Sequence, residues 1–325
     1  MEEHTQSKTK TMISIQNLHK SYGKKDVLLG LNLDVYEGEL FGFIGRNGVG
    51  KSTTIDCMIG AKKFSLGSIT LDEFDVTKNP LEAKSMYGYV ASEPTCYEEM
   101  TGYDYLEFIA SIYQMNEGDF RRNTEYLCHR LQLKLEELSN PIGDYSHGMK
   151  QKLCLVASLI HSPKIWILDE PTVGLDPKQI TEIRELIKEL GKTHTIIFSS
   201  HILSEVSQIC NKVIIINKGK IVAIDTPENL EKKVNNNNTV YVTVEDLEQK
   251  MDSIKDKIEE IKDVKLVKEN EDGTKQYVIE ANGDTDLRKV IFSEFAKENI
   301  TIFEMKKADI TLEDAFMQLI EGGEK

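Results

Sequence analysis

Long apolar runs, paired cysteines and a surplus of positive charge are all missing from this sequence, and each absence excludes a class of protein. The longest aliphatic stretches are short, for example residues 213–216, whereas a membrane-spanning helix needs about 18 apolar residues. The five cysteines are scattered without C-x-x-C spacing, which argues against a disulfide framework or a zinc site and is typical of a reducing compartment. The polar start has no apolar segment of a secretory signal.

Negative charge dominates the composition. Asp and Glu total 54 against 40 Lys and Arg, which gives a net charge of −14, and most of the excess falls after residue 235. Because like charge repels phosphate, this balance disfavours a nucleic-acid partner. A chain of 325 residues with 40% hydrophobic residues is long enough to bury a sizeable core, and we expect roughly two domains.

Apolar runs alternate with helical patterns through the first 234 residues, which predicts an α/β fold with a largely parallel sheet. Residues 13–18 alternate and are expected to form an edge strand. Residues from about 95 to 160 show helical periodicity and little strand character, so we expect a helical subdomain inserted in the α/β core. The buried strands are expected at residues 40–44, 165–168, 195–198 and 213–216.

A polar run at residues 235–238 is predicted to be a linker between two domains, 1–234 and 239–325. The pattern after it is strand, helix, strand, strand, helix, strand, followed by a short helix at 312–320. The first helix of this series is expected at residues 247–261. This order predicts a small α+β accessory domain with a ferredoxin-like fold.

A glycine-rich segment at residues 45–52 fits the pattern G-x-x-x-x-G-K-[ST]. Glycines let the backbone curl so that its N–H groups converge on phosphate oxygens, and the following helix presents its positive end to the same anion. Lys51 is expected to reach the β- and γ-phosphates and Ser52 to coordinate Mg²⁺. A plain glycine turn is the alternative, but a strand before and a helix after favour a nucleotide site. Its predicted binding residues are Gly45, Arg46, Asn47, Gly48, Val49, Gly50, Lys51, Ser52 and Thr53.

Two adjacent carboxylates, Asp169 and Glu170, follow the strand at residues 165–168. Asp169 is placed to hold Mg²⁺, and Glu170 to act as the general base for a water that attacks the γ-phosphate. A solvated acidic turn is the other interpretation, and the phosphate loop argues against it because Mg-nucleotide would compensate the paired negative charge.

Further motifs in the right order resemble the ATP-binding subunit of ABC transporters, over about residues 13 to 230. Residues 145–151 are similar to the signature motif of that family, residues 174–176 to its D-loop, and residues 199–201 to the switch that carries a histidine. Tyr22 stands where the family stacks an aromatic ring on adenine. Residues 310–316 are similar to the ending of subunits that pair with ABC-2-type permeases, a group that contains many drug, antibiotic and bacteriocin-resistance exporters.

The resemblance implies an ATPase that binds ATP and Mg²⁺ and energises a separately encoded membrane permease. It also implies a head-to-tail homodimer, because Ser146 and Gly148 would reach the γ-phosphate on the other protomer. The chain is then expected in the cytoplasm, peripheral on the inner face of the membrane, with residues 92–99 and the helical subdomain docking the permease. The implied catalytic residues are Lys51, Glu170 and His201, and Tyr22, Ser146, Gly148 and Asp176 join the phosphate loop in binding ATP.

Two positions depart from the family pattern. Ser92 stands where the family has a glutamine that touches the metal or the attacking water, and His147 replaces the usual third residue of the signature. We hypothesise weaker coupling at Ser92 and tolerated variation at His147. One alternative is a non-transport ABC ATPase, but the interval from Lys51 to Ser146 is too short for the coiled coil of the DNA-repair members. The other is an ATP-binding regulatory or immunity module, but such a protein would not need the general base at Glu170.

Overall fold

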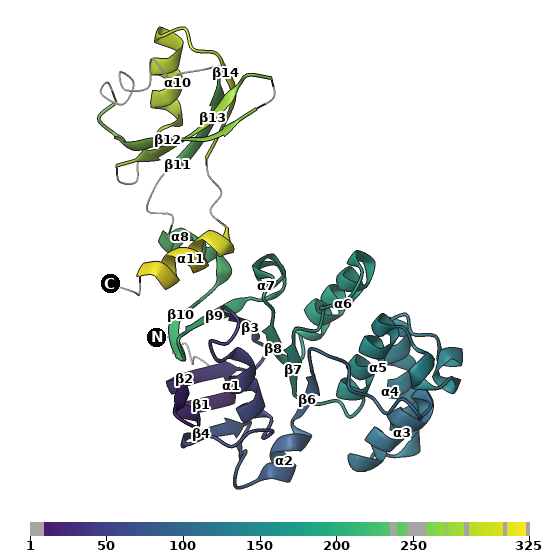
Figure 1. Ribbon diagram of the computed structural model, residues 1–325. Coiled ribbons are helices and arrows are strands. Elements are labelled where there is room, and N and C mark those ends of the chain that lie inside the picture. Colours follow the sequence, from purple (N-terminus) through teal and green to yellow (C-terminus); the bar gives the residue numbers. More distant parts are fainter. Residues whose placement is uncertain are drawn as a thin grey trace, which may run out of the picture. The chain divides into compact units, whose positions relative to one another are not determined.

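The computed structural model describes residues 10–234, 239–245, 258–270, 272–282, 286–307 and 311–322. The chain divides into two compact units, Met1–Pro227 and Glu228–Lys325 (Figure 1). The first unit contains two sheets and the second contains one, and each unit has its own buried apolar cluster, so each has the core of a domain. The predicted linker at residues 235–238 lies outside the described residues.

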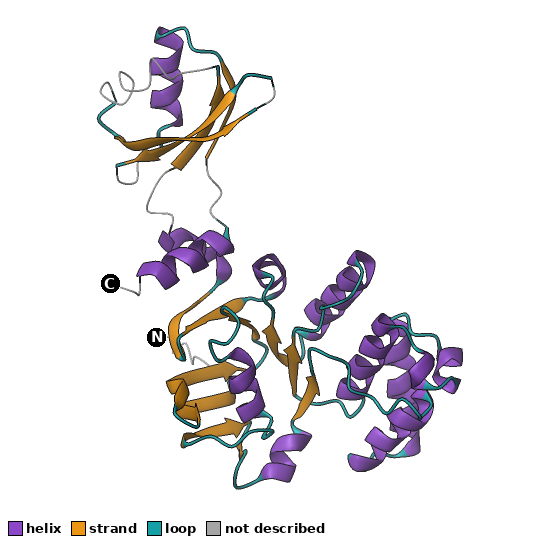
Figure 2. Cartoon of the chain, viewed as in Figure 1, coloured by secondary structure: helices purple, strands orange, loops and turns teal. Residues whose placement is uncertain are grey.

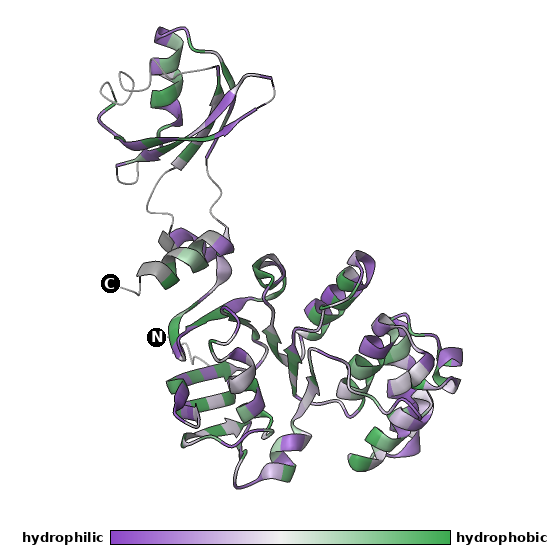
Figure 3. Ribbon diagram, in the orientation of Figure 1, coloured by the Kyte–Doolittle hydropathy of each residue, from purple (hydrophilic) through white to green (hydrophobic). Residues whose placement is uncertain are grey.

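A six-stranded sheet forms the centre of the first unit, in the order β10-β9-β3-β8-β7-β6. Its inner strands pair in parallel and only β10 is antiparallel. Strands of such a sheet are covered on both faces and therefore read as continuous apolar runs, which is the pattern that Figure 3 shows in green on β7 and β8. The bounds are β3 (Leu40–Ile44), β6 (Tyr87–Val90), β7 (Ile165–Asp169), β8 (Thr195–Ser199), β9 (Lys212–Asn217) and β10 (Lys220–Asp225).

A second sheet of the first unit is antiparallel, in the order β2-β1-β4-β5. Its strands are β1 (Thr11–Tyr22), β2 (Lys25–Tyr36), β4 (Leu66–Leu71) and β5 (Phe74–Asp75). The prediction of an edge strand at residues 13–18 was wrong, because β1 pairs with β2 on one side and β4 on the other. Helix α1 (Lys51–Met58) contributes to one apolar cluster with both sheets.

Helices fill the segment between β6 and β7, as expected from its periodicity (Figure 2). Three of them are capped by a side chain that accepts a backbone N–H of the first turn: Thr101, Asn116 and Ser146. The segment contains α3 (Gly102–Ile112), α4 (Glu117–Arg130), the 3₁₀ turns η1 (Leu135–Ser139) and η2 (Ile142–Asp144), and α5 (His147–Leu159). The other helices of this unit are α2 (Pro80–Ser85), α6 (Pro177–Leu190) and α7 (Leu203–Ile209).

The second unit has a four-stranded antiparallel sheet in the order β12-β13-β11-β14. Numbered within the unit, this is 2-3-1-4, the order of a ferredoxin-like fold. Only the end of the predicted helix at 247–261 lies within the described residues. The described elements are α8 (Pro227–Val234), β11 (Thr239–Val244), β12 (Ile261–Glu269), β13 (Lys275–Ala281), α10 (Arg288–Lys297), β14 (Ile302–Lys307) and α11 (Leu312–Gly322). Among all described helices, none is both long and apolar enough to span a membrane.

Candidate active site

The predicted phosphate loop connects the end of β3 to the start of α1. Its backbone takes left-handed φ values of 80° at Gly48 and 116° at Gly50, which a residue with a side chain adopts only with strain. Gly45 is required for a different reason, since a Cβ there would lie 2.6 Å from the carbonyl oxygen of Ile216. These glycines let the loop curl at the carboxyl edge of the sheet.

Lys51 lies inside the curl of this loop, with a side chain that is largely buried. Its Nζ donates hydrogen bonds to the carbonyl oxygens of Gly45, at 2.6 Å, and Arg46, at 3.4 Å. Burial lowers the pKa of the ammonium group, and the nearby carboxylates of Glu170 and Asp169 oppose that effect. The Lys51 ammonium group therefore provides a positive charge inside the loop for a bound anion.

Asp169 ends β7 and is almost fully buried. Burial raises the pKa of its carboxyl group, while hydrogen bonding by the Ser52 hydroxyl favours the charged form. Within the described part of the chain, its Oδ1 atom has no hydrogen-bond partner. A buried carboxylate oxygen without a partner, next to a serine hydroxyl, is a donor set that suits Mg²⁺. The predicted metal residues thus come together.

Glu170 follows directly and has a left-handed φ of 50°, a conformation that is costly for a residue with a side chain. Its backbone N–H donates to the carbonyl oxygen of Ser199 at 2.9 Å, which joins the ends of β7 and β8. Its Oε2 lies 2.9 Å from Nδ1 of His201. The strained turn therefore aims the predicted general base at the predicted histidine.

The residues of the predicted signature lie at the start of α5, where Ser146 is the N-cap and accepts the N–H of Met149. Within the described residues, no hydrogen bond joins Ser146 to Lys51 of the same chain. His147 Nε2 is instead 3.2 Å from the carbonyl oxygen of Val173. The signature therefore packs on the segment that follows Glu170.

Gln179 of α6 lies next to both Gly148 of the signature and Asp176 of the predicted D-loop. A Cβ at Gly148 would lie 2.4 Å from Nε2 of Gln179. Asp176 is the N-cap of α6 and accepts the backbone N–H of the same Gln179 at 2.9 Å. The predicted D-loop aspartate thus has a capping role within the chain.

Tyr22 lies at the end of β1 with a partly exposed ring. Nζ of Lys20 is 4.7 Å from the ring centroid and Nζ of Lys62 is 5.6 Å from it. Both ammonium groups lie over the ring, and an exposed aromatic ring with cations this close suits a ligand that combines a base with anionic phosphates.

Glu205 is a buried carboxylate that the sequence patterns did not single out. Its Oε2 accepts hydrogen bonds from Thr172 at 2.8 Å and from Ser200 at 3.2 Å. These two donors flank Glu170 and His201 in the sequence, so Glu205 holds both segments in place. In the sequence, the only feature that could have indicated this role is an acidic residue on the apolar side of the helix that became α7.

Comparisons with known proteins identify the family. Residues 28–173 match the family model described as ABC transporter. The chain is 33% identical over 234 residues to the linearmycin resistance ATP-binding protein LnrL of Bacillus subtilis, covering 72% of this chain and 75% of that protein. It is 32% identical over 315 residues to the bacitracin transport ATP-binding protein BcrA of Bacillus licheniformis, covering 96% and 98%.

The chain belongs to the ATP-binding proteins of ABC transporters.

Solved structures agree with this assignment to the ABC ATPases. A structure described as the ATP binding subunit of an ABC transporter matches with a TM-score of 0.66 and 30% identity, over 69% of this chain and 94% of that one. A dimeric ATP-binding cassette bound to ADP and phosphate has the same fold, with a TM-score of 0.61 and 21% identity. The expected fold class and ATPase activity are confirmed, and an ABC ATPase binds ATP. The roles of the individual site residues stay predictions.

Proposed function

We propose that this ABC ATPase hydrolyses Mg-ATP at sites shared by two copies of the chain and thereby drives a separately encoded ABC-2-type permease. The observation that carries the proposal is the convergence of Lys51, Asp169, Glu170 and His201 at the carboxyl edge of the parallel sheet. The carboxyl ends of parallel strands are where α/β proteins place their ligands.

The residues divide the chemistry among themselves. Lys51, Ser52 and Thr53 hold the phosphates, and Ser52 with Asp169 would hold Mg²⁺, which when bound neutralises charge on the transferring phosphoryl group. Glu170 accepts the proton of the attacking water, and His201 Nδ1, 2.9 Å from its Oε2, holds the carboxylate in position. The resemblance implies that His201 would also contact the γ-phosphate.

The second half of each site comes from the other copy. In its own chain, Ser146 accepts the N–H of Met149 and Gly148 faces Gln179 of α6. In the part of the chain that the structure describes, no hydrogen bond joins either of them to Lys51. In the head-to-tail homodimer that we propose, they reach the γ-phosphate bound to the partner protomer. Charge stabilisation from two protomers then lowers the barrier in a site closed to bulk solvent, where the attacking water is held.

The helical subdomain offers a surface for the permease. The ring of Tyr97 packs edge-on against the ring of Phe108, with centroids 6.0 Å apart, and both side chains are exposed. Ile112 on the same helix α3 is 57% exposed. Exposed apolar groups of this kind mark interaction sites. Docking there would hold the ATPase at the inner face of the membrane.

The relatives support a substrate class. One is named for linearmycin resistance, one for bacitracin transport, and a third, SrtF of Streptococcus pyogenes, for lantibiotic transport; SrtF is 37% identical over 229 residues, covering 69% of this chain and 96% of that protein. BcrA matches through the second unit as well. We propose that the permease exports an antibiotic peptide or a similar drug.

Steady-state ATP hydrolysis by the Glu170→Gln variant tests the catalytic assignment. The amide cannot accept a proton, so we expect turnover to fall by about 10²-fold or more while nucleotide binding is retained. Glu185→Gln, on the exposed face of α6, is the matched control and should hydrolyse ATP at the unchanged rate. Equal rates for Glu170→Gln and the unaltered chain would remove Glu170 from the mechanism.

Resistance of a drug-sensitive bacterium tests the export assignment. Cells that express the chain together with a permease encoded beside it should tolerate more bacitracin or lantibiotic than cells with the permease alone. The Glu170→Gln variant should give no protection. Equal protection by that variant would show that hydrolysis does not energise the transport.

A further inference from the structure

Two cysteines that are 58 positions apart in the sequence meet in the first unit. Cys96 lies in the segment between β6 and α3, and Cys154 lies in the middle of α5. Their Sγ atoms are 3.2 Å apart and share a hydrogen bond. We propose that Cys96 and Cys154 form a redox-modification site, a dithiol that hydrogen peroxide converts to a disulfide tethering the β6–α3 segment to α5.

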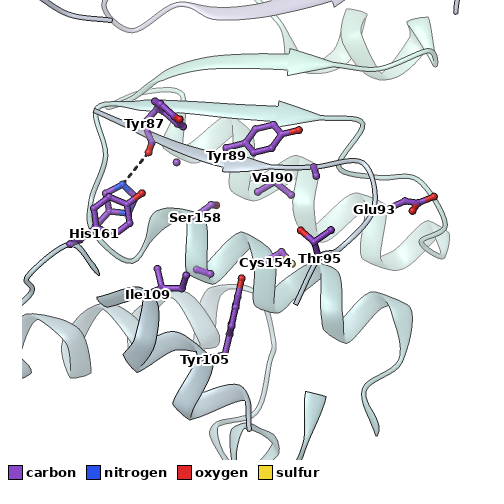
Figure 4. Close-up of a pocket in the computed structure, with 14 residues that line it drawn as sticks. Tyr87, Tyr89, Val90, Glu93, Thr95, Tyr105, Ile109, Cys154, Ser158 and His161 are labelled. Carbon is purple, nitrogen blue, oxygen red and sulfur yellow. Dashed lines mark hydrogen bonds between the residues drawn. The ribbon is translucent and has the colours of Figure 1, made fainter. Parts of the chain in front are cut away.

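A cavity reaches Cys154 and the residue beside Cys96, Thr95. A cavity of about 190 Å³ lies between β6, α3 and α5 and is lined by Cys154, Thr95 and Tyr105, among others. Figure 4 shows Cys154 at this cavity beside Thr95, with the Tyr105 hydroxyl pointing toward it. Both cysteines are only partly buried. Hydrogen peroxide is small and polar enough to enter a cavity of this size.

The surroundings give the two thiols different roles. Hydrogen bonding with Cys154 lowers the pKa of Cys96, and the Tyr105 hydroxyl and the charge of Lys150 act in the same direction. The hydrogen bond with Cys96 and burial raise the pKa of Cys154. The thiolate is the reactive form of cysteine, so Cys96 is the thiol that attacks and Cys154 is the thiol that resolves.

The reaction balances without another co-reactant. The Cys96 thiolate attacks one peroxide oxygen, the O–O bond breaks, and hydroxide leaves with a proton as water, which gives a sulfenic acid at Cys96. Sγ of Cys154 then attacks Sγ of Cys96, the S–O bond breaks, and the Cys154 proton leaves with the hydroxyl group as a second water. Two thiols are oxidised to one disulfide and the peroxide is reduced to two waters.

The other three cysteines provide an internal contrast. Cys57, Cys128 and Cys210 are buried. Burial raises the pKa of Cys57 to about 11 and that of Cys128 to about 12, and it raises the pKa of Cys210 well above its ordinary value. Structural cysteines of this kind are inert, so oxidation is expected to select the Cys96–Cys154 pair.

The tether would connect two elements of the proposed mechanism. The β6–α3 segment contains Ser92 and Tyr97, and α5 is capped by the signature residue Ser146. A disulfide between them prevents the segment from moving relative to the helix. The effect of this tether on turnover rests on the proposed function, whereas formation of the disulfide does not.

Mass spectrometry of the full-length chain tests the site. Reduced protein is treated with hydrogen peroxide, alkylated and digested without reductant. We expect a linked Cys96–Cys154 peptide as the main product, with Cys57, Cys128 and Cys210 alkylated only after unfolding. Cys154→Ser should leave a sulfenic acid at Cys96 that dimedone labels, and Cys128→Ala should leave the linkage unchanged. No linked peptide, or linkage mainly through a buried cysteine, would overturn the proposal.

ATP hydrolysis tests the tether. Oxidised protein should turn over ATP at least about fivefold more slowly than reduced protein, because gating segments must move in each cycle, and dithiothreitol should restore the rate. The double variant Cys96→Ser/Cys154→Ser should be insensitive to peroxide. If the fully disulfide-linked protein hydrolyses ATP as fast as the dithiol form, the effect of the tether on turnover is overturned. If the dithiol form has no ATPase activity, only the proposed function is contradicted.

Discussion

Ser92 is the residue at which the site departs most from the family pattern. Val90, the last residue of β6, is paired in register with Leu168 of β7, directly before Asp169 and Glu170. Ser92 therefore follows its strand at the same edge of the sheet as the two carboxylates. Its hydroxyl is shorter than the glutamine side chain by a carbonyl carbon and a methylene group, so an amide that would reach the metal or the water is missing.

We predict that Ser92→Gln raises ATP turnover and drug export roughly fivefold, the factor that an added interaction of about 1 kcal/mol gives. The longer side chain brings an amide to the carboxylate pair. Turnover by the chain with its permease measures the effect, and Ser92→Asn, which carries the same amide on a shorter stem, should show little gain. Unchanged hydrolysis and export in Ser92→Gln would contradict weaker coupling at this position.

Other parts of the site differ in how far the sequence predicts them. Glu170 and His201 each follow an apolar run, and the ends of neighbouring parallel strands meet, so their contact could be expected from the pattern alone. Glu205 and the Cys96–Cys154 contact could not be expected in this way. Both depend on how helices pack against segments distant in sequence, and neither lies in a motif whose spacing carries that information.

At the scale of elements, the junction of β6 with α3 and α5 holds a partly buried histidine, His161. The His161 ring stacks on Tyr113 with centroids 3.7 Å apart, and its Nε2 lies 3.1 Å from the carbonyl oxygen of Tyr87 (Figure 4). That contact makes Nε2 the protonated nitrogen, and Nδ1 is buried without a hydrogen-bond partner among the described residues. Burial lowers the pKa of His161 to about 4, against a weaker opposing effect of the Tyr87 carbonyl.

We predict that the first unit loses stability as the pH falls from about 6.5 to about 4. Between these pH values the unfolded chain binds a proton at His161 that the folded chain does not. The free energy of unfolding therefore falls by on the order of 3 kcal/mol over this range, and the full stabilisation by neutral His161 is present above about pH 6.5. His161→Gln keeps a donor for Tyr87 and removes the titration. Its urea midpoint should therefore fall less with pH than that of the unaltered chain.

Exposed His129 on α4 provides the control for this pH effect. His129→Gln should lose stability over the same pH range as the unaltered chain. A His161→Gln variant with the same pH dependence as the unaltered chain would show that His161 titrates normally in the folded state.

The sequence also predicts some elements of secondary structure better than others. Strands β3, β7, β8 and β9 are continuous apolar runs, and burial on both faces makes such runs predictable. The position of β1 was not predictable, because its alternating pattern reports one buried face and not its number of neighbours. Strands β2 and β4, which flank β1, supply that information only in the folded chain.

At the scale of the whole molecule, the relatives differ in how much of this chain they match. SrtF is matched over 96% of its length by 69% of this chain, whereas BcrA is matched over 98% of its length by 96% of this chain. An ATP-binding protein of this family can therefore lack a counterpart of the second unit. The second unit has its own apolar core.

We predict that the second unit strengthens the ATP-bound homodimer. It exposes Phe292 on α10 and Phe303 on β14, with 63% and 58% of each residue accessible, and burying one such ring stabilises a contact by about 2 kcal/mol. In the Glu170→Gln background, a chain that ends at Pro227 should dimerise with ATP at least about 10-fold more weakly by light scattering. Full-length Phe292→Ser should show part of this loss, and Leu266→Ser, an exposed position on β12, is the matched control. The same dimer fraction with and without residues 228–325 would reject a role of the second unit in dimerisation.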